Sequence, residues 1–392
     1  MAPCSSWRSL STSSGCAWRR RDAGRHPRSD PPQHCRRGGI TVAKLRLGVI
    51  GAGSWATAAH LPALRARGQD VEFVGVCRPG ADALARVKEC FGFRMASEDY
   101  RDVLDAGVDI VVVASPTVLH HEHASAALDA GAHVLCEKPY TISSKQAWDV
   151  VDRARRADRH LVLSFGWNHS PMIKRLKRLL TTYDIGPVEH LTVTMSSQTR
   201  ELLTDTGVYP DASPDAVPEP ETWTDPAVSG GGYGQAQLSH ALALALGLTG
   251  ARANGAFALA WTPREAQVEL HNAVSLTLEG GGICSLAGAS AFLGADGNKH
   301  HLAVEAVCSR GQFAVDVFRE RAVLFSPEAG QIDLTVAPGE GAYDGTRPAG
   351  SLVDLALGHR DENPAPGELG ARTVEALELT YRSAASGAFE RA

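Results

Sequence analysis

The sequence predicts an α/β fold, with a doubly wound parallel sheet in its N-terminal half and an antiparallel sheet in its C-terminal half. Three observations predict it. An apolar strand-like run ends in a glycine-rich turn at residues 51–56, and a helical pattern follows. Strand-like runs then alternate with helical patterns up to about residue 164, as in a parallel sheet with helices on its faces. From residue 188, strand-like runs follow one another across Gly-rich turns, which favours antiparallel pairing.

The glycine turn is the first element with a chemical meaning. Gly51, Gly53 and Ala56 form the pattern G-x-G-x-x-A between the apolar run and the helix. Gly51 allows the sharp turn, Gly53 lets a pyrophosphate approach the main chain, and Ala56 is small enough for close helix packing. The amides that open the helix, near Ser54 and Trp55, would face the phosphates. The segment therefore predicts dinucleotide binding.

The composition excludes several classes of protein. The 392 residues are 44% hydrophobic and 21% charged, which is typical of an ordinary globular protein long enough for two domains. The net charge of −5 argues against nucleic acid as the main partner. No apolar run approaches the roughly 20 residues that span a bilayer. The 8 cysteines include no C-x-x-C pair, and Cys77, Cys136 and Cys284 are expected to be small buried hydrophobes in a reducing compartment. We therefore expect a cytoplasmic protein.

Residues 1–41 differ from the rest of the chain. They are rich in Arg, Ser and Pro and contain no apolar period, so we expect a disordered extension. A targeting peptide, a twin-arginine signal without its apolar region, a basic tail that contacts nucleic acid and upstream sequence from a misassigned start remain open interpretations. The extension is left out of the fold prediction.

The second strand, at residues 71–77, ends at the position that usually binds the adenine ribose. An acidic residue there is typical of an NAD site, but this chain has Arg78. Arginine can bind a 2′-phosphate with two hydrogen bonds, so the sequence favours NADP. The nearby Asp82 keeps NAD open.

The next strand, at residues 109–114, ends in Ser115, Pro116 and Thr117, and a helix with three histidines follows. His120, His121 and His123 suggest a metal site, but no acidic ligand accompanies them. We therefore expect histidines with protein or solvent partners and no metal.

The chain resembles the glucose–fructose oxidoreductase, inositol dehydrogenase and MocA (Gfo/Idh/MocA) family. The residues that carry the resemblance are GAGSWA at 51–56, the 115–120 loop, GAHVLCEKP at 131–139, the triple glycine at 230–232 leading to His240, and the closing helix. The resemblance implies a Rossmann domain at 42–166 that binds NAD or NADP. It also implies a C-terminal domain at 167–392 with a large, open, mostly antiparallel sheet, a last helix at about 368–387 and a role in homo-oligomer formation, as a dimer or tetramer.

The resemblance also implies an activity and a set of site residues. Typical members transfer a hydride between nicotinamide and a secondary alcohol or ketone of a sugar or polyol. Lys138 of the Glu-Lys-Pro run would lie near the reacting carbon, and His240 would manage the proton. The cofactor residues expected on this basis are Gly51, Gly53, Ser54, Trp55, Ala56, Arg78, Ser115, Pro116, His120, Glu137 and Lys138. The substrate residues are Trp167, Asn168, Gln237 and His240.

Two departures from the family pattern bear on this mechanism. The aspartates expected around His240 are replaced by Ala236 and Ala243, and no arginine follows Asn168-His169. Two alternatives therefore stay open: a hydrolase or lyase that retains NAD, and a non-catalytic NAD(P)-binding sensor or scaffold. The acidic, Pro-rich stretch at 202–229 is expected to be a loop that covers the substrate.

Overall fold

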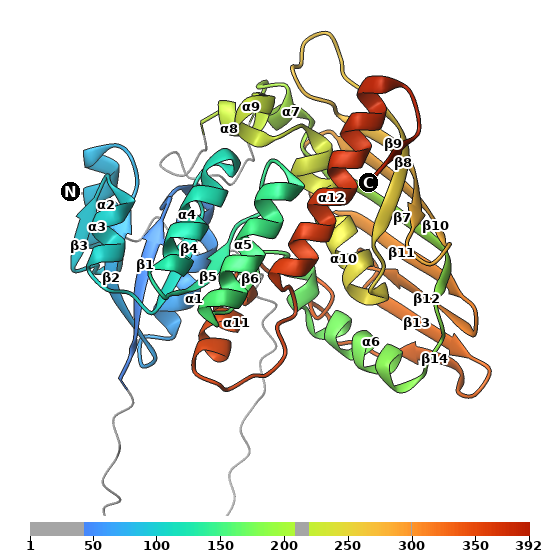
Figure 1. The fold of residues 1–392 in the computed structure, drawn as a ribbon, viewed down its shortest axis with the longest axis horizontal. Coiled ribbons are helices and arrows are strands. Elements are labelled where there is room, and N and C mark those ends of the chain that lie inside the picture. Colours follow the sequence, from blue (N-terminus) through green and yellow to red (C-terminus); the bar gives the residue numbers. More distant parts are fainter. Residues whose placement is uncertain (1–42, 208–218, 299) are drawn as a thin grey trace, which may run out of the picture.

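The structure is a computed structural model that describes residues 43–207, 219–298 and 300–392 (Figure 1). The Arg-rich extension expected at 1–41 lies outside the described residues. The described chain forms two sheets, side by side, with helices between and around them (Figure 1).

The first sheet has six parallel strands in the order β3-β2-β1-β4-β5-β6. Because the order reverses between β1 and β4, the carboxyl ends of these strands border the crevice where doubly wound folds bind ligands. The strands are β1 (Leu45–Ile50), β2 (Val71–Cys77), β3 (Met95–Ser97), β4 (Ile110–Val113), β5 (His133–Cys136) and β6 (Leu161–Leu163).

Helices cover both faces of this sheet, which explains its unbroken apolar runs. Val111 and Val113 pack in one core cluster with α4, α5 and α12. Ile110 and Val112 face the opposite way and pack with α1, α2 and α11. The helices are α1 (Leu61–Ala66), α2 (Ala81–Phe91), α3 (Tyr100–Asp105), α4 (Thr117–Asp129), α5 (Ser144–Ala157), α11 (Arg347–Ala356) and α12 (Gly367–Ser386).

The second sheet has nine strands in the order β14-β13-β12-β11-β7-β10-β9-β8-β15. Only the pairing of β7 with β10 is parallel among the pairs of this sheet in the described residues. The strands are β7 (Val188–Gln198), β8 (Ala253–Trp261), β9 (His271–Leu278), β10 (Ile283–Ala291), β11 (His301–Cys308), β12 (Gly311–Asp316), β13 (Arg321–Ser326), β14 (Gly330–Leu334) and β15 (Glu390–Arg391).

One face of the second sheet is covered and the other is open. Helices α6 (Pro171–Thr182), α10 (Ser239–Thr249) and α12 contribute to the core on the covered face. The helix α12 also packs against α5 and β8, so it joins the two sheets (Figure 1). Large apolar side chains remain exposed elsewhere on the strands, among them Phe257, Leu259, Trp261 and Ile283.

The stretch expected to be a loop at 202–229 is partly helical, so this expectation was wrong in detail. It contains part of α7 (Arg200–Leu203), α8 (Glu221–Thr224) and α9 (Pro226–Ser229). Proline at the first position and the Asp225 carboxylate, which accepts a hydrogen bond from the Ala227 amide at 2.8 Å, begin α9. Residues 208–218 lie outside the described part of the chain.

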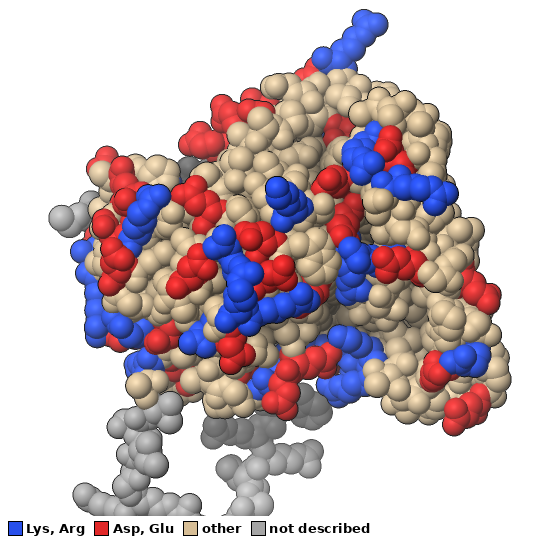
Figure 2. All heavy atoms as spheres, viewed as in Figure 1, with Lys and Arg blue, Asp and Glu red and all other residues tan. Residues whose placement is uncertain are grey.

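On the face that Figure 2 shows, neither positively nor negatively charged side chains dominate the surface. Lys and Arg groups alternate there with Asp and Glu groups (Figure 2). In the described ranges, no helix is both long enough and apolar enough to cross a membrane.

Candidate active site

The glycine turn has the geometry that a bound pyrophosphate needs. Gly51 has φ of 86°, and a Cβ there would lie 2.2 Å from the Ser115 amide nitrogen, so no other residue fits. A Cβ at Gly53 would meet nothing within 4 Å, so the main chain is open on that side. The helix that follows passes through a π turn at Ala56–His60, with Ala56 buried against the sheet. Because the first amides of a helix lack partners within it, the residues at this turn fit a dinucleotide.

Arg78 lies directly beside this turn. Its Nη1 donates to the Ala52 carbonyl at 3.3 Å, and its Nε donates to the Pro79 carbonyl at 3.2 Å. Asp82 is exposed in the first turn of α2. The structure therefore places a cation at the end of β2, next to the glycine turn.

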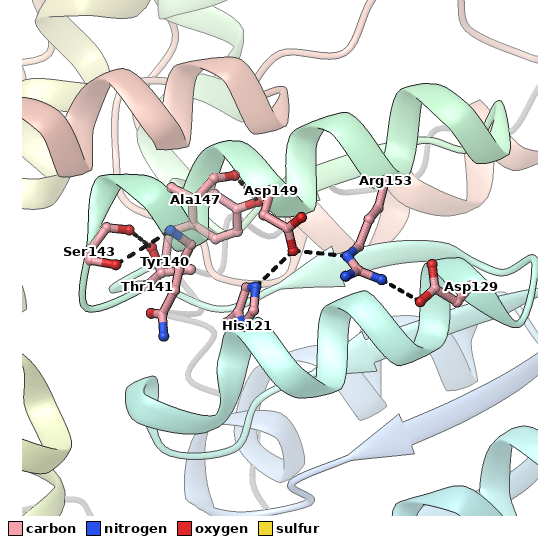
Figure 3. A network of polar contacts seen from close by, with 9 residues as sticks. His121, Asp129, Tyr140, Thr141, Ser143, Ala147, Asp149 and Arg153 are labelled. Atoms are coloured by element: carbon pink, nitrogen blue, oxygen red, sulfur yellow. Dashed lines mark hydrogen bonds and ion pairs between the residues drawn. The ribbon is translucent and has the colours of Figure 1, made fainter.

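The three neighbouring histidines have three different partners. His121 contacts the Asp149 carboxylate at 2.9 Å, and Arg153 bridges this carboxylate to Asp129 (Figure 3). His123 contacts the Ser115 hydroxyl at 2.9 Å. Within the described ranges, no three His, Cys, Asp or Glu residues are placed to hold a metal ion.

His120, predicted to bind the cofactor, connects two loops. Its Nε2 contacts the Ser115 carbonyl at 2.7 Å, and its Nδ1 contacts the Pro139 carbonyl at 2.8 Å. Burial lowers the pKa of His120. Through these two contacts, the buried His120 side chain holds the Ser115–Pro116 loop against the Glu-Lys-Pro loop at 137–139.

Glu137 is also a buried connector. Its Oε1 lies 2.6 Å from His60 Nε2, and its Oε2 accepts from the Lys138 amide at 2.9 Å. Burial alone would raise the pKa of Glu137, but the hydrogen bond and charge of His60 and the charge of Lys138 hold it below its ordinary value. Glu137 thus ties the π turn of the first helix to the backbone of Lys138. The segment is fixed again at Tyr140, whose hydroxyl donates to the Ala147 carbonyl at 3.3 Å (Figure 3).

The side chain of Lys138 crosses from the first sheet to the second half of the chain. Its Nζ donates to the Ala236 carbonyl at 3.0 Å and lies 5.7 Å from the centre of the Trp223 ring in α8. Burial lowers the pKa of Lys138, and the nearby Glu137 charge opposes that shift. Ala236 is the position where the resemblance placed an aspartate, so the lysine contacts a main-chain oxygen there.

His240 lies in α10 within an aromatic cluster. Its ring meets Trp167 edge-to-face at 5.3 Å and Tyr343 at 5.4 Å between centroids. Its Nδ1 is buried without a hydrogen-bond partner among the described residues. Burial, together with the positive charge of Lys138 and the nearby His300, holds the pKa of His240 well below 6.5. The ring is therefore neutral at neutral pH.

The other predicted substrate residues have different surroundings. Trp167 is almost fully buried in the cluster, and its Nε1 has no partner among the described residues. The Asn168 Nδ2 donates to the Ala243 carbonyl at 3.0 Å, so this amide holds α10 in place. Gln237 lies on the turn that leads into α10 and is buried there.

Sequence reasoning missed the aromatic residue that joins the two halves of the site. The ring centroid of Tyr343 lies 4.8 Å from that of Trp167 and 6.2 Å from that of Trp55, which is in the glycine turn. Gly166 makes room for it, because a Cβ there would lie 2.6 Å from the Tyr343 ring. The Glu320 carboxylate accepts from the amides of Gly339, Gly341 and Ala342 at 2.9–3.0 Å, and thereby fixes the loop before Tyr343. No local motif marks Tyr343 in the sequence.

Glu269 was missed as well. Its carboxylate accepts from the Gly232 and Gly234 amides at 2.9 and 2.8 Å and from the Tyr381 hydroxyl at 2.8 Å. A Cβ at Gly231 would lie 2.3 Å from the Tyr381 oxygen, which explains why the turn consists of glycines. This arrangement anchors the turn from which α10 carries His240. The triple glycine was the signal available, but it did not identify the partner.

The comparisons with known proteins concern the Rossmann segment and the overall fold. Residues 45–165 match the family model described as an oxidoreductase family with an NAD-binding Rossmann fold, Gfo/Idh/MocA. The chain is 32% identical over 150 residues to the D-glucoside 3-dehydrogenase of Escherichia coli, covering 38% of this chain and 42% of that protein. It is 41% identical over 71 residues to a glycosyl hydrolase family 109 protein of Streptomyces coelicolor, covering 17% of this chain and 15% of that protein. The chain thus spans less than half of these relatives.

The fold is also that of solved structures. Levoglucosan dehydrogenase, solved with NADH and levoglucosan, aligns with a TM-score of 0.71 at 18% identity, over 89% of this chain and 99% of that one. At this identity the likeness shows the fold, a Rossmann sheet followed by a large mixed sheet. Residues 45–165 are thus similar to the Rossmann domain of the Gfo/Idh/MocA oxidoreductase family.

Proposed function

We propose that this protein is an NAD(P)-dependent oxidoreductase that acts on a CH–OH group of a sugar- or polyol-like substrate. The observation that carries the proposal is the contact of Lys138 Nζ with the Ala236 carbonyl, four residues before His240, next to an aromatic cluster that reaches the glycine turn through Tyr343 and Trp55. The names of the dehydrogenase relatives support a sugar substrate.

The residues would divide the work as follows. The open main chain at Gly53 and the amides of Ser54 and Trp55 would hold the pyrophosphate. When bound, the nicotinamide supplies the hydride chemistry. Lys138 Nζ keeps N–H groups beyond the one given to Ala236, and these would donate to the substrate oxygen and stabilise its developing charge.

Proton transfer would fall to His240. The ring is neutral and Nδ1 has no hydrogen-bond partner among the described residues, so one ring nitrogen has a lone pair that would accept the hydroxyl proton during oxidation and return it during reduction. In the part of the chain that the structure describes, His240 Nδ1 has no hydrogen-bond partner, and Ala236 and Ala243 stand where the family pattern has aspartates. Packing against Trp167 and Tyr343 would orient the imidazole instead. This site therefore does its acid–base work without an Asp–His pair.

The cofactor preference and the subunit number are further parts of the proposal. Arg78 beside the glycine turn supports NADP, since its guanidinium could bind a 2′-phosphate. Solved relatives hold NAD or NADH, so NAD remains the competing choice. The apolar side chains exposed on the second sheet support a homo-oligomer.

A second candidate function is a hydrolase that retains its NAD. The similarity to the family 109 glycosyl hydrolase favours it. Such an enzyme would show bound nucleotide without net turnover of added coenzyme, and it would cleave glycosides.

The test uses a panel of polyols and keto-sugars with both coenzymes, followed at the absorbance band of the reduced nicotinamide. We expect turnover, and we expect Lys138→Met to lower it by roughly a hundredfold or more while coenzyme affinity, measured by calorimetry, stays within about threefold. The matched control is Lys145→Met, at the start of the neighbouring helix α5. Full activity of Lys138→Met would refute the site, and failure of both coenzymes to bind would refute the function.

A further inference from the structure

The aromatic cluster around His240 contains more unsatisfied nitrogen atoms than a packed core tolerates. Trp167 Nε1, His240 Nδ1 and His300 Nδ1 are all buried and lack hydrogen-bond partners among the described residues. The Trp167 ring meets both histidine rings edge-to-face, at 5.3 and 5.6 Å. Only 2% of Trp167 and 4% of His240 is exposed. Buried polar groups without partners are rare and costly, so this group of nitrogens indicates a place for ligand atoms.

The hydrogen-bonding capacity of the cluster is dominated by donors. The indole Nε1 of Trp167 can only donate. Lys138 Nζ has three N–H groups, and the Ala236 carbonyl takes one. Each neutral histidine offers one donor and one acceptor. A ligand group that offers only acceptors therefore satisfies this cluster better than a group of hydroxyls, each of which brings a donor of its own.

The cluster also contains a cationic group, the Lys138 ammonium, which contacts a carbonyl and forms no ion pair with a carboxylate among the described residues. Glu137 is engaged with His60 and the Lys138 amide. The positions where the resemblance placed aspartates are Ala236 and Ala243. Besides burial, the charges that shift the pKa values of His240 and His300 are those of Lys138 and neighbouring histidines, and all of them lower these pKa values.

We propose that this cluster binds an anionic oxygen group of the substrate, either the carboxylate of a sugar acid or the phosphate ester of a sugar, through Lys138, Trp167 and His300. The inference rests on the proposed function and specifies its substrate class. His240 remains the proton acceptor for the reacting hydroxyl. His300 becomes a specificity residue contributed by the segment that leads into β11, on the second half of the chain.

Two matched substrate pairs test the charge preference and distinguish the two sources of the anion. We would measure kcat/KM for gluconate against glucitol and for glucose 6-phosphate against glucose, and the affinity of each compound by calorimetry with the oxidised coenzyme present. In at least one pair we expect the anion to be favoured roughly tenfold or more in both measurements, since one charge-assisted hydrogen bond contributes about that factor. The favoured pair identifies carboxylate or phosphate.

The inference would be overturned if, in both pairs, the neutral compound binds and reacts at least as well as the anion. It would also be overturned if neither anion binds. If coenzyme turnover occurs without a charge preference, this inference alone fails. If neither coenzyme binds, the proposed function fails as well.

A variant pair assigns the preference to the cluster. Trp167→Phe keeps an aromatic ring but removes the buried N–H, so we expect the affinity for the anion to fall roughly tenfold and its KM to rise by a similar factor, with a smaller change in kcat. His300→Gln is expected to act in the same direction. The control is Trp261→Phe, because 49% of Trp261 is exposed and its ring stacks on His271. Unchanged anion affinity in folded Trp167→Phe, checked by its melting temperature, would contradict the assignment.

Discussion

The Glu269 carboxylate offers the clearest test of how the fold positions the site. It is 7% exposed and accepts hydrogen bonds from the Gly232 amide, the Gly234 amide and the Tyr381 hydroxyl. Glu269→Ala would leave three donors without this partner. Each unsatisfied buried donor costs about 1–3 kcal/mol, and water entering the space would recover part of that cost. We therefore expect a destabilisation of about 3–5 kcal/mol.

This magnitude is large enough to measure directly. For a domain of this size, 1 kcal/mol shifts the melting temperature by roughly 2–4 °C, so the variant should melt about 10 °C lower in differential scanning calorimetry. Because the same turn leads into α10 and His240, kcat/KM at 25 °C should fall at least tenfold in the folded variant. Glu265→Ala is the control, since its side chain is 60% exposed and lies 3.9 Å from Arg200. A shift below about 2 °C in Glu269→Ala would refute the reasoning.

Three further predictions follow from other parts of the molecule. Arg78→Ala should weaken NADP binding roughly 10- to 100-fold in a fluorescence titration and leave NAD binding nearly unchanged; equal losses for both coenzymes would contradict the assignment. Burial lowers the pKa of His169 from 6.5 to about 3, so below pH 6.5 the unfolded chain takes up a proton that the folded chain does not. Stability should therefore fall with decreasing pH, with His169 contributing up to about 1.4 kcal/mol per pH unit, and urea unfolding of His169→Asn at pH 5 and 7 should show a weaker dependence. Leu259→Asp combined with Ile283→Asp, on the exposed apolar surface of the second sheet, should lower the particle mass in light scattering; a wild-type monomer would rule out the expected oligomer.

Much of the first sheet follows from local pattern. Strands such as Ile110–Val113 are buried on both faces, so they are apolar without interruption and easy to locate. The strands β3, β8, β13, β14 and β15 were not predicted. In β8, Gly255 interrupts the half-exposed pattern, and several outward side chains are large and apolar. The partly helical stretch after residue 200 was predicted as a loop because its helices have only four residues each.

The candidate site likewise contains residues that sequence motifs predicted and residues that only the tertiary contacts identify. Lys138 and His240 were predicted on motifs, and the structure places the Lys138 Nζ on the carbonyl of Ala236, four residues before His240. Glu137 and His120 were predicted to bind the cofactor. In the structure they have buried partners in the protein, and through these contacts they hold the loops at 115–116 and 137–139 in place. Tyr343, His300 and Glu269 were missed because each is important only through contacts with residues distant in the sequence.

The amino-acid sequence by itself determined the glycine turn, the alternation of strands and helices in the first half of the chain, and the chemical groups that follow these strands. These features depend on local spacing, and neighbouring residues along the chain are sufficient to specify them. Only the tertiary structure decided which of those groups face one another. The Lys138 ammonium contacts the carbonyl of Ala236, 98 positions away, because α10 and the Glu-Lys-Pro loop pack across the two sheets. The charge and unpaired nitrogens of the cluster arise from that packing, since burial gives them their cost and their chemistry.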